Sequence, residues 1–248
     1  MKISVLTVCY NSAETIAHTL DSFCAQTHED KELVIIDGAS TDDTLAVVDR
    51  YRQPGITVLS EPDRGMYDAL NKGLGLFTGD AFGVLNADDT YSGPNALATI
   101  ATGLADADMV HGNLRFVEDH EAKRVVRRWT ASDPGERHFR SGWMPAHPTF
   151  YVRRHVAEDV GLFDLQYKTA SDYDWMMRAV RAGHHTLGRI DETLVDMQQG
   201  GKSTVSLRSH IDHNLEALRA RRKWLGAGLV DYALFAKPLG KIGQYFQR

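Results

Sequence analysis

Short apolar runs alternate with amphipathic stretches over the first 108 residues. The apolar runs are rich in β-branched residues and are bounded by Gly, Pro, Asp or Asn, which is typical of buried strands. They predict strands over residues 3–10, 33–36, 56–59 and 82–85. Helical spacing predicts helices over 16–23, from 40–43 onward, and over 66–76. Strands that alternate with helices predict an α/β fold with right-handed crossovers and a mostly parallel sheet.

The pattern changes after residue 108. Shorter strands of mixed character are predicted over residues 109–112, 114–117, 125–129 and 149–152. Residues 133–148 read as a loop, residues 172–182 as a helix, and the chain from 206 onward as mostly helical, with basic residues gathered at 219–223. We therefore expect one domain over residues 1–205 and a helical extension over 206–248.

Composition narrows the class of protein. The chain has 248 residues, of which 43% are hydrophobic and 25% charged, as in an ordinary soluble globular protein. The formal net charge of −5 argues against a general nucleic-acid binder. We expect no signal peptide and no membrane span. Cys9 and Cys24 are expected to be thiols of the core, which fits a reducing, cytoplasmic compartment.

Polar side chains stand where the early strands end. The carboxyl ends of parallel strands meet at one edge of a sheet, and open α/β sheets bind ligands there. Adjacent carboxylates suit Mg²⁺ or Mn²⁺ shared with substrate phosphates. The alternative is local: these residues form turns or cap the helix that begins near Pro94. No glycine-rich dinucleotide fingerprint or phosphate-binding P-loop follows the first strand. The residues in question are Thr7, Tyr10, Asn11, Asp37, Asp63, Arg64, Asn86, Asp88 and Asp89.

Four ordered motifs carry a resemblance to a known family. Residues 8–12 (VCYNS), 36–42 (IDGASTD), 61–73 (EPDRGMYDALNKG) and 85–89 (LNADD) are similar to those of family-2 glycosyltransferases, inverting enzymes of GT-A fold that use nucleotide sugars. The closest likeness is to bacterial enzymes of exopolysaccharide, colanic-acid-like or glycolipid synthesis. It implies a Rossmann-like sheet flanked by helices, with a smaller mixed sheet on the acceptor side. Residues 1–108 would bind the nucleotide sugar and residues 109–205 the acceptor.

The resemblance also implies roles for residues of the donor site. Asp37 would accept hydrogen bonds from the nucleotide base, and the family's metal-binding Asp-x-Asp motif falls on Asn86-Ala87-Asp88. Because Asn86 replaces the first aspartate, Asp88 is the expected ligand of Mg²⁺ or Mn²⁺ and Asp89 the second choice. The other expected donor-binding residues are Thr7, Tyr10, Asn11, Asp63, Arg64, Asn71, Lys72 and Ala87.

The expected general base is Asp172, in the segment Thr169–Trp175. Many relatives carry Glu-Asp where this chain has Ser171-Asp172, and a carboxylate here would take the proton of the acceptor hydroxyl. The alternative is that Asp172 is only the N-cap of the helix that follows. Trp143 and His147 resemble acceptor-site residues, and Lys202 resembles part of a closing loop; packing or solvation would explain each equally well.

We therefore expect an inverting transferase that moves a sugar from a nucleotide-diphosphate sugar to a glycan or lipid-linked acceptor, in the cytoplasm or on the inner face of the membrane. The tail either lies on anionic lipid or packs on its own domain or on a second subunit in a homodimer. The rivals are a sugar nucleotidyltransferase and a non-catalytic nucleotide-sugar-binding assembly subunit.

Overall fold

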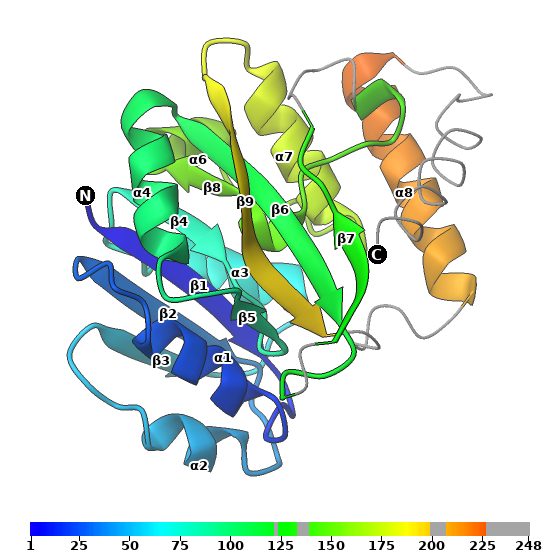
Figure 1. Cartoon of the computed structure of the whole chain (residues 1–248). Helices are drawn as coiled ribbons and strands as arrows, with labels where there is room; N and C mark the ends of the chain where they lie inside the picture. Colours follow the sequence, from blue (N-terminus) through cyan, green and yellow to red (C-terminus); the bar gives the residue numbers. More distant parts are fainter. Residues whose placement is uncertain (122–123, 133–138, 199–206, 227–248) are drawn as a thin grey trace.

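The computed structural model describes residues 1–121, 124–132, 139–198 and 207–226, with the backbone alone for 207–211. Nine strands form one sheet in the order β3-β2-β1-β4-β8-β6-β9-β5, and β7 pairs with β6 (Figure 1). The strands are β1 Ile3–Cys9, β2 Lys31–Asp37, β3 Ile56–Ser60, β4 Ala81–Val84, β5 Asp89–Tyr91, β6 Met109–Val117, β7 Val125–Trp129, β8 Tyr151–Arg153 and β9 Leu187–Gln198.

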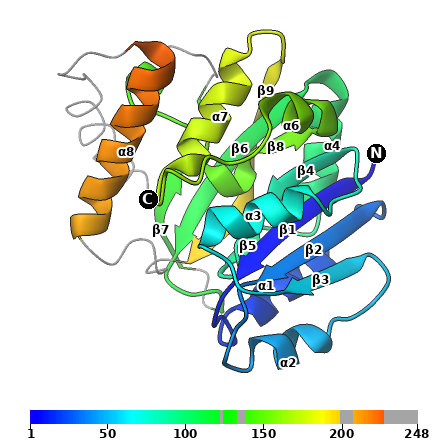
Figure 2. The same cartoon turned by 180° about the vertical axis from the view of Figure 1, so that it is seen from behind.

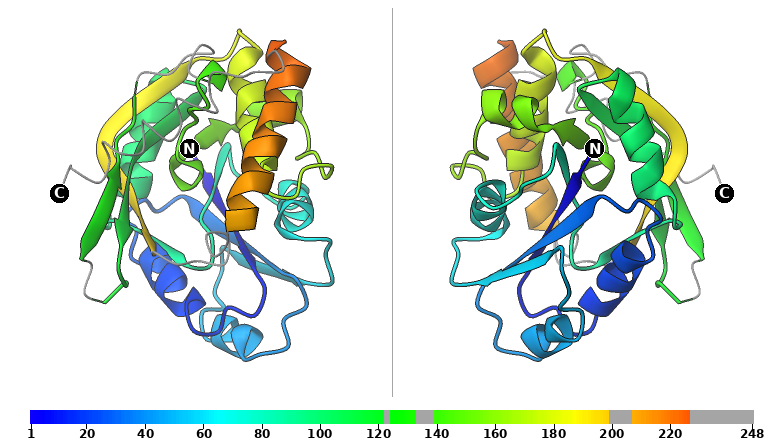
Figure 3. Two further views of the ribbon diagram at one scale, coloured as in Figure 1. Left: turned by 90° about the vertical axis from the view of Figure 1, so that its right-hand side faces the viewer. Right: turned by 90° about the vertical axis from the view of Figure 1, so that its left-hand side faces the viewer.

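Helices cover both faces of the sheet. α1, α2 and α4 lie on one face, while α3, α6 and α7 lie on the other with α8 outside α7 (Figures 1 and 2). Each face has its own apolar core, so the central strands of the sheet are buried between two helical layers (Figure 3). The helices are α1 Ile16–Cys24, α2 Thr44–Asp49, α3 Met66–Leu74, α4 Ala96–Asp106, the short 3₁₀ helix η1 His147–Thr149, α6 Arg154–Val160, α7 Ser171–Arg181 and α8 Leu207–Leu225.

The four strands of the first half are parallel, as the sequence predicts. β1 pairs with β2 and β4, and β2 pairs with β3. The register sets Cys9 opposite Asp37 and Asp37 opposite Ser60. Three strands therefore end at the same level, which brings their polar end residues together.

The strands of the second half are mixed and extend the same sheet. β8 is antiparallel to β4 and to β6, whereas β9 runs parallel to β6 and antiparallel to β5. The predicted strand over 149–152 is only partly right, because residues 147–149 form η1 and β8 begins at Tyr151. The sequence pattern missed β9, whose pairing with β6 is interrupted by register shifts.

Candidate functional site

Asp37 is the buried centre of the polar cluster at the ends of β1, β2 and β3. Its side chain accepts hydrogen bonds from the Ser40 backbone N–H at 3.0 Å, from the Ser40 hydroxyl and from the Ser60 hydroxyl at 2.7 Å. The Cys9 thiol lies 3.7 Å away, and burial followed by the charge of Asp37 raises the pKa of that thiol. These contacts hold the carboxylate in one orientation.

An exposed aromatic ring lies beside this cluster. Tyr10 is 55% exposed, and the Asp63 carboxylate approaches Gly38 so closely that a Cβ there would lie 2.6 Å from its Oδ2 and 3.5 Å from the Tyr10 ring. Asn11 and Ala39 have φ values of 48° and 59°. Non-glycine residues rarely adopt such backbone, and its occurrence at two adjacent strand ends is typical of a ligand site.

Residues 86–89 form a turn that holds the second group of carboxylates. The Asn86 amide donates to Asp89 Oδ2 at 2.9 Å, and the Asp89 N–H donates to the Asn86 carbonyl at 3.0 Å. Asn86 Oδ1 and Asp89 Oδ1 are buried, and neither has a hydrogen-bond partner among the described residues. Burial, and then the charge of Asp88, raise the pKa of Asp89 well above its usual range. Oxygen acceptors without a donor beside the Asp88 carboxylate fit a hard divalent cation.

The expectation that Asp88 or Asp89 caps the next helix is wrong. α4 begins at Ala96 with Asn95 at the N-cap position, and Asp89 instead lies in β5 opposite Met197 of β9. The Thr19 hydroxyl of α1 donates to the Asp89 carbonyl at 2.8 Å, and His120 Nε2 donates to the Asp88 carbonyl at 2.8 Å. Tertiary contacts therefore fix this turn.

Asp172 lies where the two halves of the chain meet. Its Oδ1 accepts hydrogen bonds from the Tyr67 hydroxyl of α3 at 3.0 Å and from the Tyr173 N–H at 2.8 Å. Burial, followed by the charge of Asp172, raises the pKa of Tyr67 well above its usual range, so this phenol stays protonated and donates. Burial lowers the pKa of His147, and the negative charge of Asp172 offsets part of that shift, so the imidazole interacts with this carboxylate.

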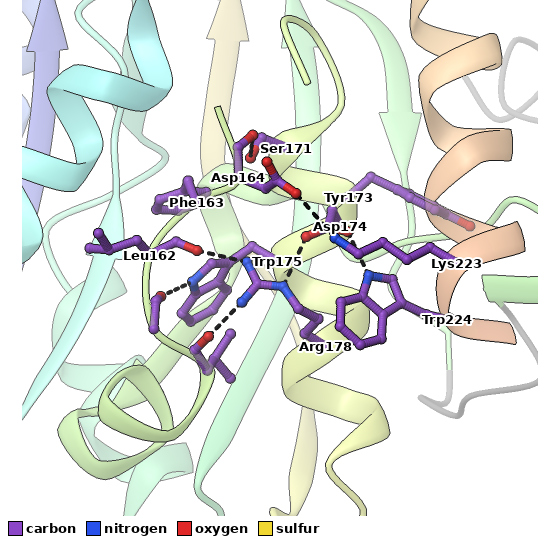
Figure 4. Close-up of polar contacts among 12 residues, drawn as sticks. Leu162, Phe163, Asp164, Ser171, Tyr173, Asp174, Trp175, Arg178, Lys223 and Trp224 are labelled. Atoms are coloured by element: carbon purple, nitrogen blue, oxygen red, sulfur yellow. Dashed lines mark hydrogen bonds and ion pairs between the residues drawn. The ribbon is translucent and has the colours of Figure 1, made fainter. Parts of the chain in front are cut away.

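The first turn of α7 separates two aspartates. Two residues along a helix are about 200° apart, so Asp172 and Asp174 face opposite ways. Asp174 is fully buried and accepts from Arg178 Nε at 2.8 Å and from Trp224 Nε1 of α8 at 2.7 Å (Figure 4). The N-cap of α7 is Ala170, so the interpretation of Asp172 as the cap is wrong.

Comparison with known proteins identifies the family. The family model described as "Glycosyl transferase family 2" matches residues 4–161. This chain belongs to glycosyl transferase family 2. A "PGL/p-HBAD biosynthesis glycosyltransferase" of Mycobacterium tuberculosis is 27% identical over 215 residues, covering 79% of this chain and 81% of the relative. An "Uncharacterized glycosyltransferase" of the same species is 31% identical over 184 residues, covering 71% of this chain and 68% of the relative.

Solved structures show that the glycosyltransferase has the GT-A fold predicted from its sequence. The structure "S. aureus TarS 1-349 in complex with UDP" has a TM-score of 0.69 at 20% identity and covers 94% of this chain and 68% of that one. "Mannosyltransferase PcManGT from Pyrobaculum calidifontis in complex with GDP-Man and Mn2+" has a TM-score of 0.68 at 21% identity, covering 95% and 68%.

Several expected donor-site residues make structural contacts in the glycosyltransferase. Thr7 is buried and donates to the Leu85 carbonyl at 2.8 Å. The Asn71 side chain pairs with both the N–H and the carbonyl of Phe163, at 2.8 and 3.0 Å. Lys72 binds Glu61 at 2.9 Å, and Arg64 binds Asp68 at 3.0 Å. Roles for these four residues at the donor stay predictions.

Trp143, expected at the acceptor, packs edge-on against Phe139 and His111, with ring centroids 5.8 and 5.7 Å away. Lys202 and residues 227–248 of the tail lie outside the described residues. Across the described segments, no helix is both long and apolar enough to cross a membrane.

The prediction that both cysteines are core thiols is only partly right. Cys9 is buried and both cysteines are free, but Cys24 is exposed, so its assignment to the core is wrong.

Sequence reasoning gave no role to Tyr67 or to Glu216 of α8. Glu216 Oε2 accepts from the N–H groups of Thr169 and Ala170 at 2.8 and 3.1 Å, and its Oε1 accepts from Lys168 N–H at 3.0 Å. The segment that leads into Asp172 is thus held from α8. Helical spacing already placed Tyr67 on the buried face of a predicted helix, so the sequence held a signal for it. Nothing in the sequence pairs residue 216 with residues 168–170.

Proposed function

We propose that this glycosyltransferase inverts the anomeric centre as it moves a sugar from a nucleotide-diphosphate sugar to a hydroxyl of a glycan or glycolipid, with Asp172 as the general base. The observation that carries the proposal is the hydrogen bond from Tyr67 of α3 to Asp172 of α7. It ties the helix between β3 and β4 to the carboxylate of the second half, at the junction where donor and acceptor would have to meet.

The chemistry follows from the position of that carboxylate. Asp172 takes the proton of the acceptor hydroxyl as its oxygen attacks the anomeric carbon, and the bond from that carbon to the diphosphate oxygen breaks. Because the hydroxyl of Tyr67 and the N–H of Tyr173 engage Oδ1, Oδ2 is the atom we assign to the proton. The nucleoside diphosphate leaves with the bonding electron pair, on the face opposite the base.

The nucleotide is proposed to bind at the ends of β1, β2 and β3. Tyr10 offers an exposed ring for a base or ribose, with Asn11 beside it, and Asp63 offers an acceptor for base N–H groups. Asp37 is buried and its oxygens accept from Ser40 and Ser60, so its proposed hydrogen bond to the base requires one of these donors to give way. Support comes from solved structures of the same fold, which are complexes with UDP, UDP-GlcNAc and GDP-Man. Asp37, Asp63 and Tyr10 do not by themselves select between uracil and guanine.

A divalent cation, Mg²⁺ or Mn²⁺, is proposed to bind Asp88, with Asp89 as second choice and the Asn86 amide oxygen nearby. The fit rests on the unpartnered oxygens of Asn86 and Asp89. When bound, such an ion offsets the charge that the diphosphate gains on leaving. The protein's own part is to hold these oxygens rigidly, through the hydrogen bond between Asn86 and Asp89.

The acceptor is proposed to be a cell-surface glycan or glycolipid. This rests on the relative named for PGL/p-HBAD biosynthesis, which is similar over 79% of the chain. The division into a catalytic domain over 1–205 and an extension over 206–248, peripheral membrane contact and a homodimer stay predictions.

Two measurements test the proposal. Thermal shifts with UDP, GDP and dTDP in the presence of Mn²⁺ identify the nucleotide, because a ligand of the folded state raises the melting temperature (Tm) by mass action. With the matching nucleotide sugar, Asp172→Asn is expected to lower transfer by about 10²–10⁴-fold, as a lost general base does, while the nucleotide still raises Tm. Transfer by Asp172→Asn at the wild-type rate would remove Asp172 from the mechanism.

A further inference from the structure

Three histidines and two aspartates gather at the opposite end of α7 from Asp172. They come from the α4–β6 junction (Asp108), from α6 (His155, Asp159) and from the α7–β9 loop (His184, His185). The α7–β9 loop lies at the top of Figure 1, where β9 begins. Nothing in the proposed transfer reaction uses this edge of the sheet.

Asp159, His184 and His185 are the most closely convergent of the five. Asp159 Oδ2 lies 3.1 Å from His184 Nε2 and 3.2 Å from His185 Nε2. Two nitrogens therefore point at one carboxylate oxygen, and all three ligand atoms lie within 4.8 Å of one another. Zinc bound at about 2.0–2.2 Å with tetrahedral angles sets its ligand atoms about 3.3–3.6 Å apart. The observed separations differ from that by a few tenths of an ångström.

The tautomer of His184 is set by its own chain. Its Nδ1 lies 2.8 Å from the Ala182 carbonyl, and a carbonyl only accepts, so Nδ1 carries the proton. Its Nε2 lies within hydrogen-bond distance of Asp159 Oδ2, at 3.1 Å, so a protonated ring donates from both nitrogens, and a bound ion would take the place of the Nε2 proton. Metal-binding histidines are typically oriented in this way, with the other ring nitrogen donating to a carbonyl or carboxylate.

His185 supplies an independent observation. Its side chain is only 3% exposed, and its Nε2 is buried without a hydrogen bond among the described residues. A buried polar atom without a partner is costly, and an imidazole nitrogen is satisfied by a donor or by a metal ion. The atom that lacks a partner is also the atom that faces Asp159.

The loop that carries these histidines is anchored. Asp108 Oδ2 accepts hydrogen bonds from the Thr186 N–H and hydroxyl, both at 2.8 Å. Asp108 Oδ1 lies 3.1 Å from His155 Nε2, and His155 packs against His185 with ring centroids 5.4 Å apart. Asp108 thus fixes the residue next to His185, so little chain entropy is lost when an ion binds.

We propose that Asp159, His184 and His185 form a binding site for a borderline transition-metal dication of the Zn²⁺ type, with water completing its coordination. Two imidazoles and one carboxylate favour zinc over magnesium, which prefers oxygen ligands. The site differs in chemistry from the all-oxygen group at Asp88, and its bound ion would link α6 to the α7–β9 loop. The proposal does not depend on the transfer reaction.

The test is Zn²⁺ binding to tag-free protein, by competition with a chromophoric chelator. Wild type and Asp88→Asn are expected to bind one Zn²⁺ with similar affinity, whereas His184→Ala and Asp159→Asn lose at least about tenfold, as removal of a ligand from a small metal site does. At 100 times its dissociation constant, Zn²⁺ should raise the Tm of wild type by about 5 °C or more. His28→Ala, on the segment before β2, controls for the loss of one histidine.

His184 and Asp159 are both more than half exposed, so these variants are expected to fold like wild type, and the Tm of each without metal checks this. Wild-type Zn²⁺ affinity in His184→Ala and Asp159→Asn would overturn the proposal. So would loss of the Zn²⁺ ion in Asp88→Asn, because the ion would then belong to the carboxylates of residues 86–89.

Discussion

Glu216 of α8 is the residue whose removal tests most sharply how Asp172 is held. Its carboxylate accepts three consecutive backbone N–H groups, of Lys168, Thr169 and Ala170, at 2.8–3.1 Å. It also accepts the Thr169 hydroxyl at 2.9 Å. Ala170 is the N-cap of the helix whose second residue is Asp172, so the end of that hydrogen-bonded segment sets the position of the proposed base.

The magnitude follows from the count of donors. A hydrogen bond to a charged group is worth about 1.5–3 kcal/mol, and water can replace the part of it that involves an exposed donor. Since Lys168 is exposed and Ala170 is buried, we expect Glu216→Ala to cost about 3 kcal/mol of the free energy of unfolding. For a chain of this size that lowers Tm by about 6–12 °C. A shift of about 1 Å in a reacting group costs about 10²-fold, which sets the expected fall in kcat.

The assay separates positioning from binding. Below the unfolding temperature, Glu216→Ala should lower kcat about 10–100-fold with the KM of the nucleotide sugar unchanged, because the strands proposed to bind the donor are untouched. Asp212→Ala removes the same charge from an exposed position one turn earlier in α8 and should leave both constants unchanged. Equal kcat in the two variants would refute the positioning of Asp172 by Glu216.

The pH dependence gives an independent check. Burial raises the pKa of Glu216, but the hydrogen bonds from Lys168, Thr169 and Ala170 outweigh it, and the pKa lies below its usual range. A carboxylate whose folded pKa is depressed contributes stability above its unfolded pKa and loses it as the pH falls. Wild type should therefore lose stability on acidification from about pH 4.5 downward by more than Glu216→Ala does.

Three further predictions concern single side chains. Gly83→Ala would set a Cβ 2.3 Å from the buried ring of Tyr151, so we expect urea denaturation to report a loss of about 3 kcal/mol in the free energy of unfolding. Gly93→Ala, whose Cβ would meet nothing within 4 Å among the described residues, should show no change. Tyr67→Phe removes a hydrogen bond to the proposed base and should lower kcat about tenfold without weakening nucleotide binding. An unchanged kcat would contradict the role of this hydrogen bond. Burial raises the pKa of Glu32, but hydrogen bonds from lysine, serine and threonine side chains outweigh it and bring the pKa to about 2. Wild type should therefore lose about 2 kcal/mol of the free energy of unfolding between pH 4.5 and pH 2, and Glu32→Gln should not.

The parallel half of the fold was predictable because its signals are local. Apolar runs such as 33–36 are buried on both faces of the sheet, and their polar end residues meet wherever the strands lie parallel. The clustering of Cys9, Asp37 and Ser60 therefore follows from strand order alone. Strand β9 was not predictable, because at the far side of the sheet it carries charged residues along its length and its pairing with β6 shifts register.

The candidate site was predictable only as far as motif and spacing reach. Asp172 and Asp88 stand in recognisable segments, and the opposite orientation of Asp174 follows from helix periodicity. The partners of these carboxylates come from distant segments: Tyr67 lies 105 residues before Asp172, and Trp224 lies 50 residues after Asp174. No local rule pairs residues across such separations, so the contacts that orient the site required the fold.

The contacts of α8 bear on where the catalytic unit ends. The family model stops at residue 161, yet α8 buries Ala217, Ala220 and Leu225 in the same core as α7. Arg221 donates to the Tyr173 hydroxyl at 3.2 Å, and Trp224 donates to buried Asp174 (Figure 4). Without α8, Asp174 would keep Arg178 but lose Trp224, and its carboxylate would be only partly satisfied.

A chain that ends at residue 205 is therefore expected to be less stable than one that ends at residue 226. Exposure of the α7 core face and loss of the Glu216 anchor both act on the segment that carries Asp172. We expect the 1–226 chain to keep wild-type kcat and cooperative unfolding, and the 1–205 chain to lose both while its α1 side, with a separate core, keeps helical circular dichroism. Full transfer activity in the 1–205 chain would show that catalysis does not require α8, and that the turn before Asp172 keeps its conformation without Glu216.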